Sequence, residues 1–267
     1  MLSSLGFSVI ACGLAVKAGH VLCLTLGGAV PFYRFLYIFC VSQVSRYLPG
    51  RIWPVVGFTV LLEREKIRRS VAFALPFLHQ GTMVTVFLLL GVLLCGPVVT
   101  TKLVHQPIAI VYTVCGVLAL ILVLLPPVSR LFNRSVPITV TRAGYYKCIL
   151  LFVMSGVILS WAFFFFLASL VSVSLSQALF LGGFFLLAYV MGWIVFLAPA
   201  GLGVREGTLG LLLSSVWPLG LSNLIALAAR LWMTVAELML LGGVFLVVKL
   251  VKGKYLLSAD QESRTYT

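Results

Sequence analysis

Long apolar runs without charge constrain the fold of this chain more than any other feature. Residues 148–170 and 177–198 contain no Asp, Glu, Lys or Arg. Each run reaches the roughly 20 apolar residues that an α-helix needs to cross the hydrocarbon core of a bilayer. A lipid-exposed backbone must satisfy its own hydrogen bonds, which an α-helix does within one segment. The sequence therefore predicts an all-α integral membrane protein.

The remaining composition extends this prediction to the whole chain. Of 267 residues, 62% are hydrophobic and 9% are charged, against about a quarter charged in soluble domains. We expect a polytopic helical bundle of about seven spans, including two broken or re-entrant helix segments. Residues 1–257 would form a single membrane domain, and residues 258–267 a polar cytoplasmic tail. The other expected spans are 5–30, 71–96, 108–125 and 221–248.

The positive charges predict an orientation. A net charge of +13 would suggest nucleic acid in a soluble protein, but here the cations gather at the ends of apolar runs, so no nucleic-acid partner is expected. Loops 63–70 and 126–147 each carry four Lys or Arg, whereas the loop between them carries Lys102 alone. The positive-inside rule places both loops and the C-terminus in the cytoplasm. The side on which the N-terminus lies stays open.

Two stretches combine helix breakers with arginine. Pro49 and Gly50 divide residues 31–62 into two half-length elements, and the sequence from Ala198 to Gly207 interrupts a second region. Backbone groups freed at such breaks persist in a membrane only where protein or a water-filled cavity satisfies them. Paired interrupted segments are also a sequence indication of a transport site. We expect the second stretch to be a broken crossing, while the first could equally be re-entrant.

Charged residues inside the apolar zone indicate where a site would lie. Beyond residue 70 these are Arg205, Glu206, Arg230 and Glu237, and a charge at the bilayer centre costs about 2.5–3.5 kcal/mol on insertion scales. Arg230 and Glu237 are seven residues apart and share a helix face. The residues expected to form a headgroup-binding cavity are Arg46, Tyr47, Pro49, Gly50, Arg51, Trp53, Pro199, Gly201, Gly203, Arg205, Glu206, Arg230 and Glu237.

A structural alternative exists for each of these charges. Glu206 or Glu237 could form an ion pair with Arg230 that orders the bundle without binding a ligand. Arg46 and Arg51 could extend to lipid headgroups from an interfacial position.

Other residue types have structural interpretations. The six cysteines are not spaced as metal ligands, and we expect them to be buried packing residues. The five tryptophans are expected at the membrane interfaces, with the lining of a substrate path as the alternative. His79 is expected to be a hydrogen-bonded interior histidine, with a proton site as the alternative. Close helix contacts are expected at Gly182–Gly183, Gly203 and Gly207, and Gly242–Gly243.

The inventory of acidic residues argues against an enzyme. The chain has six acidic residues, and Asp260 is its single aspartate. It has no carboxylate cluster for Mg²⁺, no HExxH motif and no Gly-rich phosphate loop. We therefore expect no catalytic residues, no metal and no cofactor, although a transferase based on Glu206 stays open.

The two interrupted stretches also resemble a known family. SRYLPGRIW (residues 45–53) and APAGLGVREG (residues 198–207), followed by Arg230, resemble the lysylphosphatidylglycerol synthase transmembrane-region family. That family includes the flippase half of the bacterial multiple peptide resistance factor and stand-alone relatives, so the resemblance implies a protein of the bacterial inner membrane. The resemblance extends from about residue 30 to 250, although Ala200 stands where glycine is common in the family.

The resemblance implies movement of a phospholipid or polyprenyl-linked lipid between leaflets through a charged cavity. Lysyl transfer is not expected, since no stretch of the sequence resembles the family's soluble aminoacyltransferase domain. The expected function is therefore a lipid flippase or transporter-like protein for an anionic phospholipid or a polyprenyl-phosphate-linked lipid. The alternatives are a non-catalytic accessory subunit of a membrane glycosyltransferase or synthase and, less favoured, a lipid-headgroup transferase. A homo-oligomer stays open.

Overall fold

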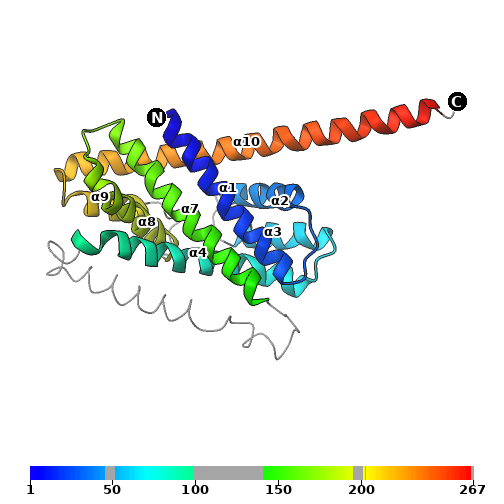
Figure 1. Cartoon of the computed structure of the whole chain (residues 1–267), viewed down its shortest axis with the longest axis horizontal. Helices are drawn as coiled ribbons and strands as arrows, with labels where there is room; N and C mark the ends of the chain where they lie inside the picture. The colour runs from blue at the N-terminus through cyan, green and yellow to red at the C-terminus, as the bar shows by residue number, and fades with distance from the viewer. Residues whose placement is uncertain (46–51, 99–140, 195–200, 202, 266–267) are drawn as a thin grey trace.

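The computed structural model describes residues 1–45, 52–98, 141–194, 201 and 203–265, and in these residues the regular structure is helical. Figure 1 shows the arrangement of the helices. Their bounds are α1 Leu2–Thr25, α2 Phe32–Val44, α3 Trp53–Arg64, α4 Arg69–Val98, α7 Arg142–Ala168, the short 3-10 helix η3 Leu175–Gln177, α8 Ala178–Ile194, α9 Val204–Leu213 and α10 Leu219–Thr265.

Five segments are long and apolar enough to cross a membrane: Leu2–Thr25, Arg69–Cys95, Arg142–Ala168, Leu175–Ile194 and Leu219–Val247. They overlap the spans expected around residues 5–30, 71–96, 148–170, 177–198 and 221–248. The all-α, multi-pass membrane class is thereby confirmed. The expected span 108–125 lies outside the described residues, so the total of about seven stays a prediction.

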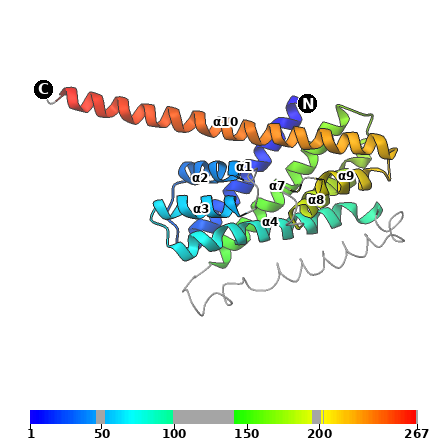
Figure 2. The same cartoon turned by 180° about the vertical axis from the view of Figure 1, so that it is seen from behind.

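Helices α1 and α7 lie side by side across one face of the bundle (Figures 1 and 2). The Ser155 hydroxyl of α7 donates a hydrogen bond to the Ala11 carbonyl of α1 (2.8 Å). Trp232 of α10 donates to the Ser4 hydroxyl (3.1 Å) and stacks on Phe166, with ring centroids 4.9 Å apart. Trp232 is 4% exposed, so its expected interfacial position is wrong: it is a core residue that joins α10 to α1 and α7.

Glycine allows α4 and α8 to approach closely. A Cβ atom on Gly183 would lie 2.5 Å from the Cys95 sulfur and 3.0 Å from the Gly91 carbonyl oxygen. The expected contact at Gly182–Gly183 is therefore confirmed. The same expectation is wrong for Gly203 and Gly207 and for Gly242 and Gly243, because the described structure places no neighbouring atom within 4 Å of their Cβ positions.

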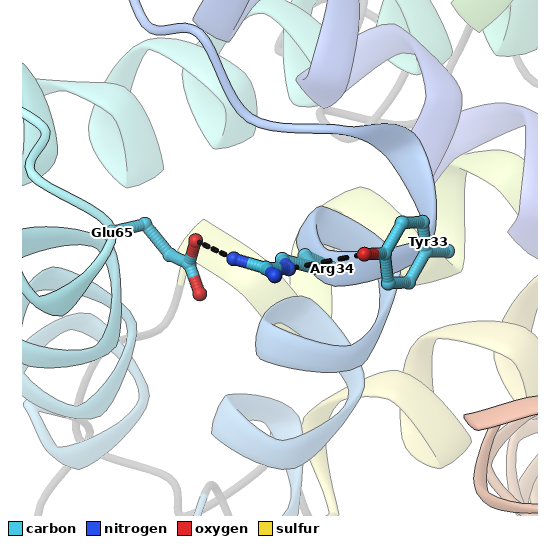
Figure 3. Close-up of polar contacts among 3 residues, drawn as sticks. All are labelled: Tyr33, Arg34 and Glu65. Atoms are coloured by element: carbon cyan, nitrogen blue, oxygen red, sulfur yellow. Dashed lines mark hydrogen bonds and ion pairs between the residues drawn. The ribbon is translucent and has the colours of Figure 1, made fainter. Parts of the chain in front are cut away.

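Helices α2 and α3 form an antiparallel hairpin of two half-length helices. Arg34 near the start of α2 pairs with Glu65 at the end of α3 (2.9 Å), as Figure 3 shows. Farther along, the Phe39 and Phe58 rings meet at 6.0 Å. The hydrogen bond that Glu65 accepts raises the pKa of the Arg34 guanidinium above its usual value. At about 1.5 Å per residue, neither helix is long enough to cross the hydrocarbon core alone.

A proline in α4 explains one contact between the hairpin and the bundle. Pro76 lacks an N–H, so the Ala72 carbonyl four residues earlier loses its helical donor. The Thr59 hydroxyl of α3 donates to this carbonyl instead (3.3 Å). The hairpin is thus held against α4 by a backbone acceptor that a helix without proline at this position would not offer.

The chain begins α9 through two glycines with left-handed backbone conformations, Gly201 (φ 70°) and Gly203 (φ 84°). Helix α9 then packs against α8 and the first half of α10. Helix α10 has 47 residues, which is about 70 Å at 1.5 Å per residue, and its second half extends beyond the bundle (Figures 1 and 2). Residues 258–265 of the expected polar tail belong to this helix.

Candidate functional site

A cavity of about 410 Å³ lies between the α2–α3 hairpin, α4, α8, α9 and α10. Its volume falls in the range of about 300–1,000 Å³ that is typical of small-molecule sites. Most of its wall is apolar and aromatic. The polar and charged lining residues are Ser42, Gln43, His79, Gln80, Tyr189, Trp193, Arg205, Arg230, Thr234 and Glu237.

Arg205 enters the cavity from the first turn of α9. Its guanidinium carbon lies 4.9 Å from the ring centroid of Phe185 and 4.6 Å from that of Tyr189. A cation over an aromatic face is stabilised by the ring quadrupole, by about 0.5–2 kcal/mol depending on desolvation. Phe185 is itself fixed in the core, because it stacks on Phe163 at 4.5 Å. The two rings therefore give the Arg205 guanidinium a defined position on the cavity wall.

Gly192 allows the start of α9 to lie against α8. A Cβ atom on Gly192 would be 3.0 Å from the Cβ of Arg205, and one on Gly201 would be 2.6 Å from the Gly192 carbonyl oxygen. A side chain at Gly201 would clash with the α8 backbone, and one at Gly192 would require Arg205 to shift by a few tenths of an ångström. The glycines of the second interrupted stretch thus serve a close approach that positions Arg205.

Glu206 holds the α9 N-terminus and binds Arg230. One carboxylate oxygen accepts a hydrogen bond from the Gly203 N–H (2.8 Å), which satisfies a backbone donor at the helix start. The other lies 3.3 Å from an Arg230 nitrogen, and the two side chains are 11% and 18% exposed. The structural ion pair considered from the sequence is therefore present between Glu206 and Arg230. Arg230 also lines the cavity, so the ion pair lies at the cavity wall.

Helix α10 presents Arg230, Thr234 and Glu237 to the same cavity. The shared face expected from the spacing of Arg230 and Glu237 is confirmed by this arrangement. The described wall therefore carries two arginines and one glutamate.

Helix α4 contributes neighbouring polar residues. His79 is 5% exposed, and its Nε2 lies 3.1 Å from the Ala15 carbonyl oxygen. The rings of Phe39 and Phe152 meet it edge-on at 5.3 and 5.2 Å. The expected hydrogen-bonded interior histidine is thus observed. The Gln80 amide nitrogen is buried and has no hydrogen-bond partner among the described residues.

The predicted site residues have different outcomes. Arg205, Arg230 and Glu237 line the cavity, Glu206 adjoins it through Arg230, and Gly201 and Gly203 shape the start of α9. Trp53 begins α3, is 45% exposed and does not line the cavity. The other predicted residues, Arg46, Tyr47, Pro49, Gly50, Arg51 and Pro199, lie outside the described residues.

Sequence reasoning missed the aromatic support of Arg205. Phe185, Tyr189 and Gly192 are spaced by four and three residues, which places them on one face of α8. In an apolar run, this pattern alone is indistinguishable from ordinary core packing.

Within the described part of the chain, no group of three or more His, Cys, Asp or Glu side chains is arranged to hold a metal ion. The buried cysteines Cys23, Cys40, Cys95 and Cys148 form no disulfide. The polar groups on the cavity wall are guanidinium, carboxylate, amide, hydroxyl, imidazole and indole groups.

The fold and the site define an all-helical, multi-pass membrane protein with a charged cavity between the α2–α3 hairpin and helices α4, α8, α9 and α10. No protein-family model, curated protein or solved structure matches the chain.

Proposed function

We propose that the protein is a lipid flippase or transporter-like protein that receives the anionic headgroup of a phospholipid or polyprenyl-phosphate lipid in this cavity. The observation that carries the proposal is the position of Arg205 and Arg230 on the wall of one cavity inside an apolar bundle. Charged groups within membrane segments commonly mark substrate or ion pathways. The resemblance to the lysylphosphatidylglycerol synthase transmembrane-region family supports the same function.

The position of Arg230 along α10 supports transport more than surface binding. Arg230 lies eleven residues after Leu219, the start of α10 (230 − 219), or about 16 Å along the helix at 1.5 Å per residue. This is about half of the roughly 30 Å thickness of the hydrocarbon core. A headgroup bound there would be close to midway between the leaflets.

The chemistry of the wall favours an anion carried by an amphiphile. Guanidinium groups bind phosphate oxygens through paired hydrogen bonds, and an ion pair gains strength where water is scarce. Glu237, on the same wall, would suit a cationic or hydroxylated part of the headgroup.

A binding measurement tests the proposal. Phosphatidylglycerol should stabilise the detergent-solubilised protein against heat more than phosphatidylcholine does, because a ligand of the native state raises its apparent stability. Arg205→Ala should weaken phosphatidylglycerol binding at least about tenfold, which corresponds to about 1.4 kcal/mol. Arg69→Ala is the matched control, since that side chain is 90% exposed. Equal binding by Arg205→Ala and the wild type would reject the proposed headgroup site.

One observation favours the accessory-subunit alternative. The second half of α10 extends beyond the bundle (Figures 1 and 2), where a partner enzyme would find an accessible helix. For this function, deletion of residues 248–267 would abolish co-purification with a glycosyltransferase, while Arg205→Ala would leave it intact. The transferase alternative would instead require chemical turnover of a labelled lipid.

A further inference from the structure

The cavity reaches the outer surface of the bundle on α4. Phe77 and Gly81 both line it, yet Phe77 is 54% exposed and Gly81 is also exposed. We call these two residues the lateral mouth. They are four residues apart on α4 and therefore lie on one helix face.

The lateral mouth lies at the depth of the hydrocarbon chains. Gly81 is twelve residues after Arg69 (81 − 69), or about 18 Å along α4 at 1.5 Å per residue. Phe73, one turn before Phe77, is 57% exposed and packs against it with ring centroids 5.3 Å apart. The surface around the opening is thus apolar and suited to contact with lipid.

The size of the cavity makes such an opening necessary for a lipid ligand. A volume of about 410 Å³ accommodates a headgroup but not two full-length acyl chains as well. The arginines and the lateral mouth belong to the same cavity, so a lipid could place its headgroup at Arg205 and leave its chains in the bilayer.

We propose that the lateral mouth is the acyl-chain subsite: the ligand is a chain-bearing lipid whose hydrocarbon leaves the cavity past Phe77 and Gly81. This inference rests on the proposed headgroup function and adds the route of the chains. A water-soluble phosphate compound would have no use for an apolar opening at this depth.

Photocrosslinking tests this subsite. The probe is phosphatidylglycerol with a diazirine near the first third of one acyl chain, added to the full-length protein in phosphatidylcholine nanodiscs. The expected adducts lie on the α4 peptide containing residues 73–81, are suppressed by excess unlabelled phosphatidylglycerol, and are lost in Arg205→Ala. Suppressible, Arg205-dependent adducts confined to other helices would overturn the lateral mouth but keep the headgroup site. Adducts that neither competition nor Arg205→Ala changes would reject both.

A pair of glycine variants provides a second test. In the described structure, a Cβ atom on Gly81 or on Gly242 would meet no atom of another segment within 4 Å, so a side chain can begin at either position without a clash at Cβ. Gly242 does not line the cavity. Gly81→Leu should reduce phosphatidylglycerol binding about tenfold, a change of about 1.4 kcal/mol, whereas Gly242→Leu should bind like the wild type. Wild-type binding by Gly81→Leu, or an equal loss in both variants, would contradict the subsite.

Discussion

Arg205 connects the chemistry of the site to the core of the protein. Its guanidinium lies over Phe185 and Tyr189, and Phe185 in turn contacts the Trp232 ring at 5.7 Å. Aromatic faces stabilise a cation at a fixed position. The cost of placing an arginine within the membrane is thereby reduced while its hydrogen-bonding edges retain a defined direction.

The aromatic support of Arg205 gives a prediction for Tyr189. Tyr189→Leu removes a cation–π contact worth about 1 kcal/mol and should weaken phosphatidylglycerol binding about fivefold. Tyr189→Phe keeps the ring face and should bind like the wild type. Titrations of both variants, with their melting temperatures as a check on folding, measure the effect. A loss of equal size in Tyr189→Phe would show that the hydroxyl, rather than the ring, is responsible.

The two roles of Glu206 can be separated by two substitutions. Glu206→Gln keeps an oxygen that can accept from the Gly203 N–H and loses the ion pair with Arg230, whereas Glu206→Ala loses both. The free energy of unfolding should therefore be lower in Glu206→Ala than in Glu206→Gln by about 1 kcal/mol, the value of one hydrogen bond. Denaturant unfolding of the detergent-solubilised variants measures this difference. Equal stabilities would mean that the carboxylate does not hold the α9 N-terminus.

Helices too short to cross the membrane form part of the cavity wall, as the longer candidate spans do. The α2–α3 hairpin and α9 are each too short to cross the hydrocarbon core, and each borders the cavity. The hairpin is attached to α4 where Pro76 leaves the Ala72 carbonyl available to Thr59. The hydrogen bond that Pro76 removes from α4 thus leaves the acceptor that positions the neighbouring hairpin.

Thr59 should accordingly contribute to stability through its hydroxyl. Thr59→Val has a similar shape but cannot donate to the Ala72 carbonyl, so the free energy of unfolding should fall by about 1 kcal/mol. Thr59→Ser retains the donor and serves as the matched control. Chemical denaturation of the two variants tests the contact, which would be refuted if valine were at least as stabilising as serine.

At the element scale, the sequence predicted much of the structure. Runs such as 148–170 were predictable because length and apolarity are enough to identify a candidate membrane helix. The two short helices expected within residues 31–62 are observed as α2 and α3, whereas Pro49 and Gly50 lie outside the described residues. The sequence could not show that Trp232 is a core residue, because an interfacial and a buried tryptophan have the same local pattern. The sequence likewise could not show which glycines make close helix contacts. Gly183 and Gly242 have similar sequence contexts and differ in the atoms that surround them in the fold.

At the scale of the whole molecule, one cavity unites residues from distant parts of the chain. Phe39, Gln80, Tyr189 and Arg230 belong to four different helices and line the same space. Spacing predicted that Arg230 and Glu237 share a face, because both lie on one helix. It could not predict that α2 and α4 complete the wall, since this depends on how the helices pack.

Lipid translocation tests the central claim most directly. Proteoliposomes of phosphatidylcholine with a trace of acyl-labelled fluorescent phosphatidylglycerol would report, by dithionite quenching, how much probe moves from the inner to the outer leaflet. We expect rapid loss of the protected fluorescence with the wild-type protein and with the exposed-site control Arg69→Ala. Arg205→Ala should fall to the level of protein-free liposomes at equal reconstitution. A wild-type rate in Arg205→Ala, or a wild-type protein no faster than protein-free liposomes, would contradict the account.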